Sequence, residues 1–177
     1  METDKRSNTE LKPAVFIDRD GTINEDVGHI CSEDEFELIP GAVQALDMLQ
    51  KKYPLFVITN QAGIGMGLLS EEHFLRLNTF FEELLRREGI VIKRTYYCPH
   101  TRDDGCICRK PSPYLLKKAQ TEFDIDLSRS FVIGDHPSDV EMGMCVGTGS
   151  VYVLTGHGEK HRKELSVNPD RVANDLY

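Results

Sequence analysis

Two hydrophobic patterns alternate along this chain. Short continuous apolar runs predict buried strands over 14–17, 55–58, 91–97, 131–133 and 150–154. Between these runs, apolar residues recur at helical spacing and predict helices over 42–52, 70–88, 113–123 and 138–146. Continuous apolar strands that alternate with helices are typical of a parallel sheet covered on both faces. The pattern therefore predicts a three-layer, Rossmann-like α/β fold.

The two ends of the chain are less regular. Residues 1–12 are polar and aperiodic, so we expect a loose tail followed by a single domain over 13–177. The last stretch of about 20 residues is also polar, with weak helical character at best. The chain has 177 residues, of which 40% are hydrophobic and 28% charged, which suits one domain with a sizeable core.

The charge balance excludes some classes of function. The chain has 21 Lys and Arg against 29 Asp and Glu, a formal net charge of −8. Broad binding to nucleic acid or to a membrane surface needs clustered positive charge, so we expect neither partner. No apolar run approaches the roughly 18 residues of a membrane-spanning helix, and the first residues contain no apolar signal segment. We therefore expect a cytoplasmic protein that acts as a monomer on a small molecule.

Polar side chains follow three of the predicted strands. Asp18, Thr59 and Asp135 each stand where an apolar run ends. In an open parallel α/β sheet, ligands bind outside the carboxyl ends of the strands. The sequence therefore places these three groups at one edge of the sheet.

Carboxylates dominate this edge. Asp18 and Asp20 can point to one side of the chain, and two close carboxylates favour a bound cation. Together with Asp135 they offer the oxygen ligands that suit Mg²⁺. Two other interpretations remain open at this point: the first pair could form a surface turn or a fragment of a calcium loop, and Asp135 could cap a helix.

Arg109 and Lys110 bring two positive charges together in an acidic chain. A lysine fixed at this edge can neutralise a phosphate, and an arginine can bind one through two hydrogen bonds. The pair predicts an anion site, with a solvent-exposed lysine as the alternative.

The cysteines are unevenly distributed. Three of the five lie within 98–108, and Cys98, His100, Cys106 and Cys108 together offer three thiols and an imidazole. This set suits a closed, tetrahedral, structural Zn²⁺ site. The alternative is a group of unrelated core cysteines. Cys145 lies among apolar residues of a predicted helix, so we expect it to be buried.

Four further histidines lack ligand spacing with one another, and we expect them to be ordinary polar residues. They are His29, His73, His157 and His161.

Four spaced motifs together resemble those of the haloacid dehalogenase superfamily of phosphohydrolases. They read FIDRDGT, ITNQ, RKP and VIGDHPSD, and the resemblance covers roughly residues 14–155. It implies a Mg²⁺-dependent phosphomonoesterase. In such an enzyme Asp18 would be the nucleophile that becomes an aspartyl phosphate, and Asp20 would be the general acid and base.

The same resemblance implies binding roles for other residues. Thr59, Asn60 and Lys110 would hold the phosphoryl group. Asp135 would complete the Mg²⁺ shell together with Asp18 and the backbone carbonyl of Asp20.

The cysteine loop narrows the resemblance. Together with the other motifs, this loop resembles the branch that contains the D-glycero-D-manno-heptose 1,7-bisphosphate 7-phosphatases, as seen in DRDGTIN, ITNQAGIG and CPH…CxCRKP. Members of this branch lack a large cap domain. Histidinol-phosphate phosphatase domains are close relatives that share a zinc loop, but NEDVGHI and FELIPGAVQAL look more like the heptose enzymes. The chain departs from the branch pattern at Met66, Tyr114 and His136.

The resemblance therefore favours a phosphatase for a small sugar bisphosphate, with Arg109 available for the second phosphate. Histidinol phosphate is the alternative substrate. A phospho-acceptor receiver module does not fit, because its acceptor follows the third strand whereas the Asp pair here ends the first. An alternative of another class is a zinc-stabilised, non-catalytic binding protein.

Overall fold

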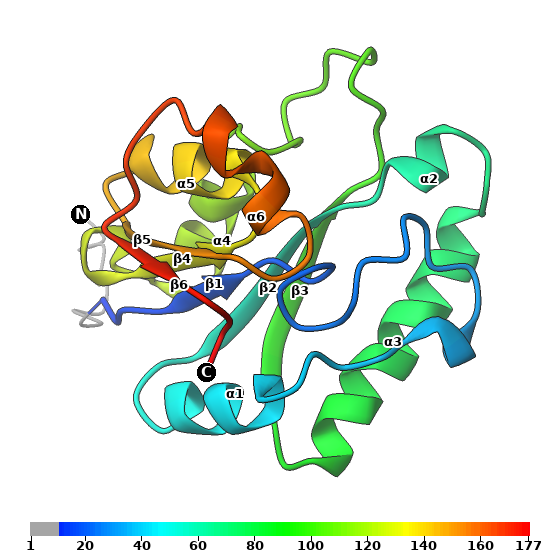
Figure 1. Ribbon diagram of the computed structural model, residues 1–177, viewed down its shortest axis with the longest axis horizontal. Helices are drawn as coiled ribbons and strands as arrows, with labels where there is room; N and C mark the ends of the chain where they lie inside the picture. The colour runs from blue at the N-terminus through cyan, green and yellow to red at the C-terminus, as the bar shows by residue number, and fades with distance from the viewer. Residues whose placement is uncertain (1–10) are drawn as a thin grey trace, which may run out of the picture.

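A six-stranded parallel sheet forms the centre of the protein (Figure 1). The computed structural model describes residues 11–177. The strands are β1 (Val15–Ile17), β2 (Leu55–Asn60), β3 (Ile92–Cys98), β4 (Phe131–Gly134), β5 (Gly149–Val153) and β6 (Arg171–Ala173). Their order across the sheet is β3-β2-β1-β4-β5-β6, and every neighbouring pair is parallel. β1 lies between β2 and β4, so the carboxyl ends of these three strands meet.

Helices cover both faces of the sheet (Figure 1). They are α1 (Ala42–Gln50), α2 (Ala62–Gly65), α3 (Glu71–Arg87), α4 (Tyr114–Phe123), α5 (Pro137–Met144) and α6 (Gly158–His161). Short 3₁₀ turns occupy Glu33–Glu35, Leu127–Arg129 and Arg162–Glu164. The predicted three-layer α/β architecture is confirmed, and no connection in the described part of the chain carries a large cap domain.

Alternate residues of the central strands build two separate cores. Phe16, Phe56 and Ile58 face α4 and α5 and pack there with Leu116 and Met142. The intervening residues face α1 and α3, where a second cluster joins Val15, Ile17, Leu55, Val57, Leu46, Phe81 and Leu85. Each fully buried side chain of this size stabilises the fold by roughly 1.5–3 kcal/mol. The period of two along β1 and β2 therefore fixes which side of the sheet each helix covers.

The long helix α3 begins and ends as its sequence predicts. The side chain of Ser70 accepts a hydrogen bond from the backbone N–H of His73, and Glu71 and Glu72 occupy the positive start of the helix. Gly89, with φ of +82°, follows the last turn and accommodates the left-handed backbone that ends many helices.

The structure contains elements that the sequence pattern did not predict. The polar C-terminal stretch includes α6 and the short edge strand β6, and α2 interrupts a predicted loop. β6 pairs with β5, and just before it Asp170 accepts hydrogen bonds from the backbone N–H and the hydroxyl of Ser150. A side-chain anchor of this kind, rather than an apolar run, holds the last strand.

The prediction that Cys145 is buried is wrong. α5 ends at Met144, and Cys145 at its C-cap is exposed to solvent. The expected N-terminal tail lies mostly outside the described residues, although Lys12 forms an isolated bridge with Ile125. Among the helices of residues 11–177, none combines the length and the apolar character needed to cross a membrane.

Candidate active site and metal centre

The carboxyl ends of β1, β2 and β4 border a cavity of about 570 Å³. Asp18 follows β1, Thr59 and Asn60 end β2, and Asp135 follows β4; all four line this cavity. Asp20, Arg109 and Lys110 also line it. The structure thus brings together the catalytic and phosphate-binding candidates that the sequence singled out.

Lys110 is a buried residue of the cavity lining. Its Nζ is 2.8 Å from Oδ2 of Asp18 and 2.7 Å from Oδ1 of Asp139, and it donates a hydrogen bond to the backbone carbonyl of Ile58. Burial alone would lower the pKa of this lysine, but the two carboxylates outweigh burial and raise it. Lys110 is therefore a fixed positive charge next to the proposed nucleophile.

Three carboxylates lie close to one another beside Lys110, and two of them contact it. One oxygen atom from each of Asp18, Asp135 and Asp139 lies within 4.8 Å of the others. Burial, reinforced by the neighbouring carboxylates, raises the pKa of Asp18 well above its ordinary value, although Lys110 opposes this. Burial and the charge of Asp139 raise the pKa of Asp135 to about 7. Such excess buried negative charge fits a divalent cation held by oxygen ligands.

Two glycines let the backbone approach Asp135 closely. A Cβ atom at Gly21 would lie 2.3 Å from Oδ2 of Asp135, and one at Gly156 would lie 2.4 Å from the same atom. Both glycines have positive φ, +79° and +52°. The same Oδ2 accepts a hydrogen bond of 2.7 Å from the backbone N–H of His157. The turn after β5 therefore fixes the orientation of this carboxylate.

Asp20 stands apart from the three clustered carboxylates. Its Oδ1 accepts hydrogen bonds from Nε of Arg19 and Nδ2 of Asn24, both 3.0 Å long. Its Oδ2 accepts from Nη2 of Arg19 and Nε2 of Gln61, each at 2.8 Å. Burial alone would raise the pKa of Asp20, but the Arg19 charge and these hydrogen bonds hold it below its ordinary value. These contacts favour the ionised form of Asp20, which is the form that a general base requires.

The two polar residues at the end of β2 are held by their neighbours. Thr59 is buried, and its Oγ1 accepts a hydrogen bond from Nε2 of Gln61. Oδ1 of Asn60 accepts one from the backbone N–H of Lys110 at 3.1 Å. Asn60 thereby helps to place the lysine, which the sequence motif alone did not indicate.

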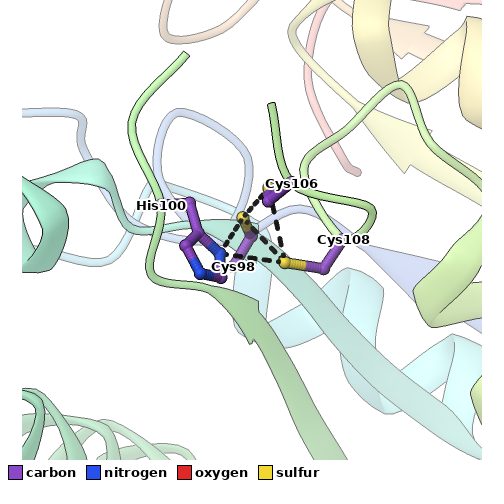
Figure 2. Close-up of side chains that lie close together, drawn as sticks. All are labelled: Cys98, His100, Cys106 and Cys108. Atoms are coloured by element: carbon purple, nitrogen blue, oxygen red, sulfur yellow. Dashed lines mark hydrogen bonds between the residues drawn. The ribbon is translucent and has the colours of Figure 1, made fainter. Parts of the chain in front are cut away.

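A second cluster of side chains of metal-ligating type lies at the end of β3 and on the loop that follows it (Figure 2). Sγ of Cys98 is 3.5 Å from Sγ of Cys106 and 3.1 Å from Sγ of Cys108, and Nδ1 of His100 is 3.3 Å from Sγ of Cys108. A Zn–S bond of about 2.3 Å gives a tetrahedron with S–S edges of about 3.8 Å. All five cysteines are free thiols. The spacing of the four ligand atoms therefore fits one tetrahedral cation.

The thiols of this cluster have different environments. Burial raises the pKa of Cys98 above the ordinary value of a thiol. At Cys106 the backbone N–H groups of Cys108 and Arg109 outweigh desolvation and lower the pKa. These N–H groups favour the thiolate, which is the form that binds metal.

Arg109 joins this cluster to the cavity. Its Nη1 donates a hydrogen bond of 3.1 Å to the backbone carbonyl of His100, and the residue lines the cavity next to Lys110. The loop that carries His100, Cys106 and Cys108 therefore also orients a guanidinium at the cavity wall.

Comparisons with known proteins agree with this geometry. A family model described as HAD-hydrolase-like matches residues 107–177. The D-glycero-beta-D-manno-heptose-1,7-bisphosphate 7-phosphatase of Photorhabdus laumondii is 40% identical, over 92% of this chain and 88% of that protein. The D-glycero-D-manno-heptose-1,7-bisphosphate 7-phosphatase of Chlorobaculum tepidum is 38% identical, over 95% and 92%.

The chain belongs to the heptose-bisphosphate phosphatase family of haloacid dehalogenase-like hydrolases. A solved relative supports the assignment in three dimensions. The D,D-heptose 1,7-bisphosphate phosphatase from B. bronchiseptica, complexed with magnesium and phosphate, has a TM-score of 0.86 and 30% identity, and the match covers 93% of each chain. The family resemblance seen in the sequence is therefore confirmed.

This phosphatase-family chain also has cavity residues that the sequence interpretation missed. His157 was expected to be an ordinary polar residue, yet it lines the cavity, its Nε2 lies 3.1 Å from Oδ2 of Asp26, and its backbone binds Asp135. The glycines on both sides of His157, in the turn that follows β5, are the signal that could have found it.

The three departures from the branch pattern have different positions in this family member. His136 caps α5 through its Nδ1, which accepts the backbone N–H of Ser138, and it lines the cavity. Met66 and Tyr114 are exposed, at the C-cap of α2 and the first residue of α4.

Proposed function

We propose that this protein is a Mg²⁺-dependent phosphomonoesterase that removes the 7-phosphate of D-glycero-D-manno-heptose 1,7-bisphosphate. The observation that carries the proposal is the contact between Asp18 and Lys110, with Asp135 and Asp139 beside it, in a member of this phosphatase family. A lysine-paired carboxylate that follows β1 and is 11% exposed is poised to receive a phosphoryl group.

In the first half of the reaction, an oxygen of Asp18 attacks the phosphorus atom of the substrate. A P–O bond to Asp18 forms while the ester P–O bond breaks. The departing sugar oxygen takes a proton from the carboxyl group of Asp20, which would have to be protonated for this step. Lys110 and Thr59 hold the phosphoryl oxygens, so charge that develops on them meets a fixed cation and a hydroxyl group.

In the second half, a water molecule attacks the phosphorus atom of the aspartyl phosphate. Asp20, now a carboxylate, accepts the proton of this water, and the P–O bond to Asp18 breaks. Free phosphate leaves, Asp18 is regenerated, and Asp20 carries the proton needed for the next cycle. The hydrogen bonds that favour the ionised form of Asp20 in this structure match its role as the base.

The two ligand sets are proposed to hold different cations. Asp18 and Asp135, together with the backbone carbonyl of Asp20, would hold Mg²⁺, and Asp139 lies close enough to take part directly or through Lys110. When bound, Mg²⁺ neutralises the charge of the transferring phosphoryl group. Cys98, His100, Cys106 and Cys108 would hold a structural Zn²⁺.

The second phosphate of the substrate is assigned to Arg109. Its guanidinium lines the same cavity as Lys110 and is held by the backbone carbonyl of His100. Arginine binds phosphate bidentately, whereas the cationic amine of histidinol phosphate would be repelled at this position.

The test compares kcat/KM for three substrates in the presence of Mg²⁺: the heptose 1,7-bisphosphate, histidinol phosphate and p-nitrophenyl phosphate. The proposal requires the highest value for the bisphosphate. A higher value for histidinol phosphate would overturn the substrate assignment, and no release of phosphate from any of the three would overturn the enzymatic function in favour of a binding protein.

A further inference from the structure

The arginine between the two catalytic aspartates is buried in an aromatic cage. Arg19 is 1% exposed, and its Cζ lies 5.5, 5.8 and 6.0 Å from the ring centroids of Phe36, Phe74 and Phe81. Phe36 precedes α1, whereas Phe74 and Phe81 lie two turns apart on α3. Aromatic faces attract a cation, and the attraction is stronger where water is excluded. We call these three rings the aromatic cage.

Among residues 11–177, the caged guanidinium has one partner of opposite charge, Asp20. Nε and Nη2 of Arg19 donate to the two different carboxylate oxygens of Asp20, at 3.0 and 2.8 Å. This two-pronged geometry fixes the plane of the carboxylate as well as its position. We call this pair of hydrogen bonds the fork. A lysine at this position could supply the positive charge but could not form the fork.

The other donors to Asp20 are neutral side chains. Asn24 donates to Oδ1, and Nε2 of Gln61 donates to Oδ2 and also to Oγ1 of Thr59. A carboxylate oxygen has two lone-pair sites, and the fork fills one on each oxygen. A substrate oxygen or a water can therefore replace a neutral donor while the fork stays in place. Gln61 also connects Asp20 to Thr59, on the phosphoryl side of the cavity.

We propose that Arg19 is a positioning residue that holds the Asp20 carboxylate where it exchanges protons with the substrate and with water, and that the aromatic cage fixes Arg19 for this purpose. The inference rests on the proposed function, because it needs Asp20 as the general acid and base. It extends that function to Arg19 and to the face of α3 that carries Phe74 and Phe81, more than 50 positions along the chain.

The first test uses the leaving group as a readout. In the Arg19→Lys variant, kcat/KM for the sugar bisphosphate should fall by about 10²-fold, the usual effect of a small misplacement of a catalytic group. For p-nitrophenyl phosphate the fall should be less than about threefold, because this leaving group departs without a proton. Equal losses for the two substrates, or no loss, would overturn the proposal.

A milder variant covers the case in which Arg19→Lys does not fold. Phe36→Leu removes one partly buried wall of the cage and leaves Arg19 and Asp20 intact. Phe36→Leu should also lower kcat/KM for the sugar bisphosphate more than for p-nitrophenyl phosphate, but by a smaller factor than Arg19→Lys does. Phe80→Leu is the matched control. The ring centroid of Phe80 lies 6.0 Å from that of Phe36, but Phe80 is not part of the aromatic cage. Identical behaviour of these two variants would contradict a role for the cage.

A double-mutant cycle then shows whether Arg19 acts through Asp20. With Asp20→Asn already present, Arg19→Lys should cause no further loss of kcat/KM for the bisphosphate. A purely structural role would give losses that multiply, and that result would overturn the proposal. Full activity of Asp20→Asn alone would instead refute the acid–base assignment in the proposed function. Loss in Asp20→Asn together with full activity of Arg19→Lys would refute only the positioning role.

Discussion

The guanidinium of Arg109 is hydrogen-bonded to the backbone carbonyl of His100, one of the four side chains that form the proposed Zn²⁺ site. Arg109 is also next to Lys110, which contacts Asp18, the proposed nucleophile. A substitution in the loop after β3 should therefore displace Arg109 and weaken its contact with the substrate, in addition to any effect on the residues that transfer the phosphoryl group. The first two predictions follow from this connection.

Loss of a thiol ligand should release zinc and loosen Arg109. The Cys106→Ser variant is expected to contain less than one zinc per chain by metal analysis. Its kcat/KM for the heptose bisphosphate should fall by roughly tenfold or more, the scale of losing one charged hydrogen bond, and by a smaller factor for p-nitrophenyl phosphate. Cys145→Ser, at an exposed cysteine outside the cluster, is the control and should match the wild type. Protein purified without chelators that holds no zinc would contradict the assignment.

Removal of the Arg109 guanidinium should affect recognition of the second phosphate. In Arg109→Ala, KM for the bisphosphate should rise by about 10–10²-fold, since a hydrogen bond to a charged group contributes about 1.5–3 kcal/mol. Kinetics with p-nitrophenyl phosphate, which has one phosphate, should change far less. Arg129→Ala, on a 3₁₀ turn outside the cavity, provides the control for lost positive charge. An equal rise of KM for both substrates would mean that Arg109 does not bind the second phosphate.

Replacement of Lys110 should make the protein more dependent on Mg²⁺ for its stability. Lys110→Met leaves Asp18 and Asp139 without their shared cation, and loss of one partner of a buried ion pair typically costs about 3–5 kcal/mol. Added Mg²⁺ should therefore raise the Tm of this variant more than it raises the Tm of the wild type. Thermal unfolding with and without Mg²⁺ measures this difference. A smaller rise of Tm with Mg²⁺ in the variant than in the wild type would contradict binding of Mg²⁺ at the carboxylates beside Lys110.

The glycine turn after β5 offers a matched test of the Mg²⁺ site. A Cβ at position 156 would lie 2.4 Å from Oδ2 of Asp135, so Gly156→Ala should displace this carboxylate. We expect the Mg²⁺ concentration for half-maximal activity to rise about tenfold or more. Gly147→Ala has a similar positive φ, +75°, but its Cβ would have no neighbour within 4 Å. It should lose some stability and keep its Mg²⁺ requirement. The same requirement in both variants would exclude Asp135 as a ligand.

Much of this site could be predicted from the sequence, because its main groups follow apolar runs. Asp18, Thr59 and Asp135 end strands, and a parallel sheet brings such ends to one edge. Cys98, His100, Cys106 and Cys108, the proposed Zn²⁺ ligands, lie so close in the sequence that the turn of the chain after β3 brings them together.

Other features depend on contacts between distant segments and left no local pattern. Gln61 reaches Asp20 because it follows β2, which is the neighbour of β1 in the sheet. Phe36, Phe74 and Phe81 surround Arg19 because α3 and the segment before α1 pack against the end of β1. β6 was missed because Arg171–Ala173 is short and is held through Asp170 rather than by an apolar run. The error at Cys145 came from the end of α5, which falls two residues earlier than the predicted helix, so that the side chain faces solvent.

The most direct test of the account is a ³¹P NMR measurement of the reaction with D-glycero-D-manno-heptose 1,7-bisphosphate and Mg²⁺. The account predicts that the wild type converts the signal of the 7-phosphate into free phosphate while the 1-phosphate signal remains, and that Asp18→Asn leaves both signals unchanged. Release of the 1-phosphate, no release by the wild type, or undiminished release by Asp18→Asn would contradict it.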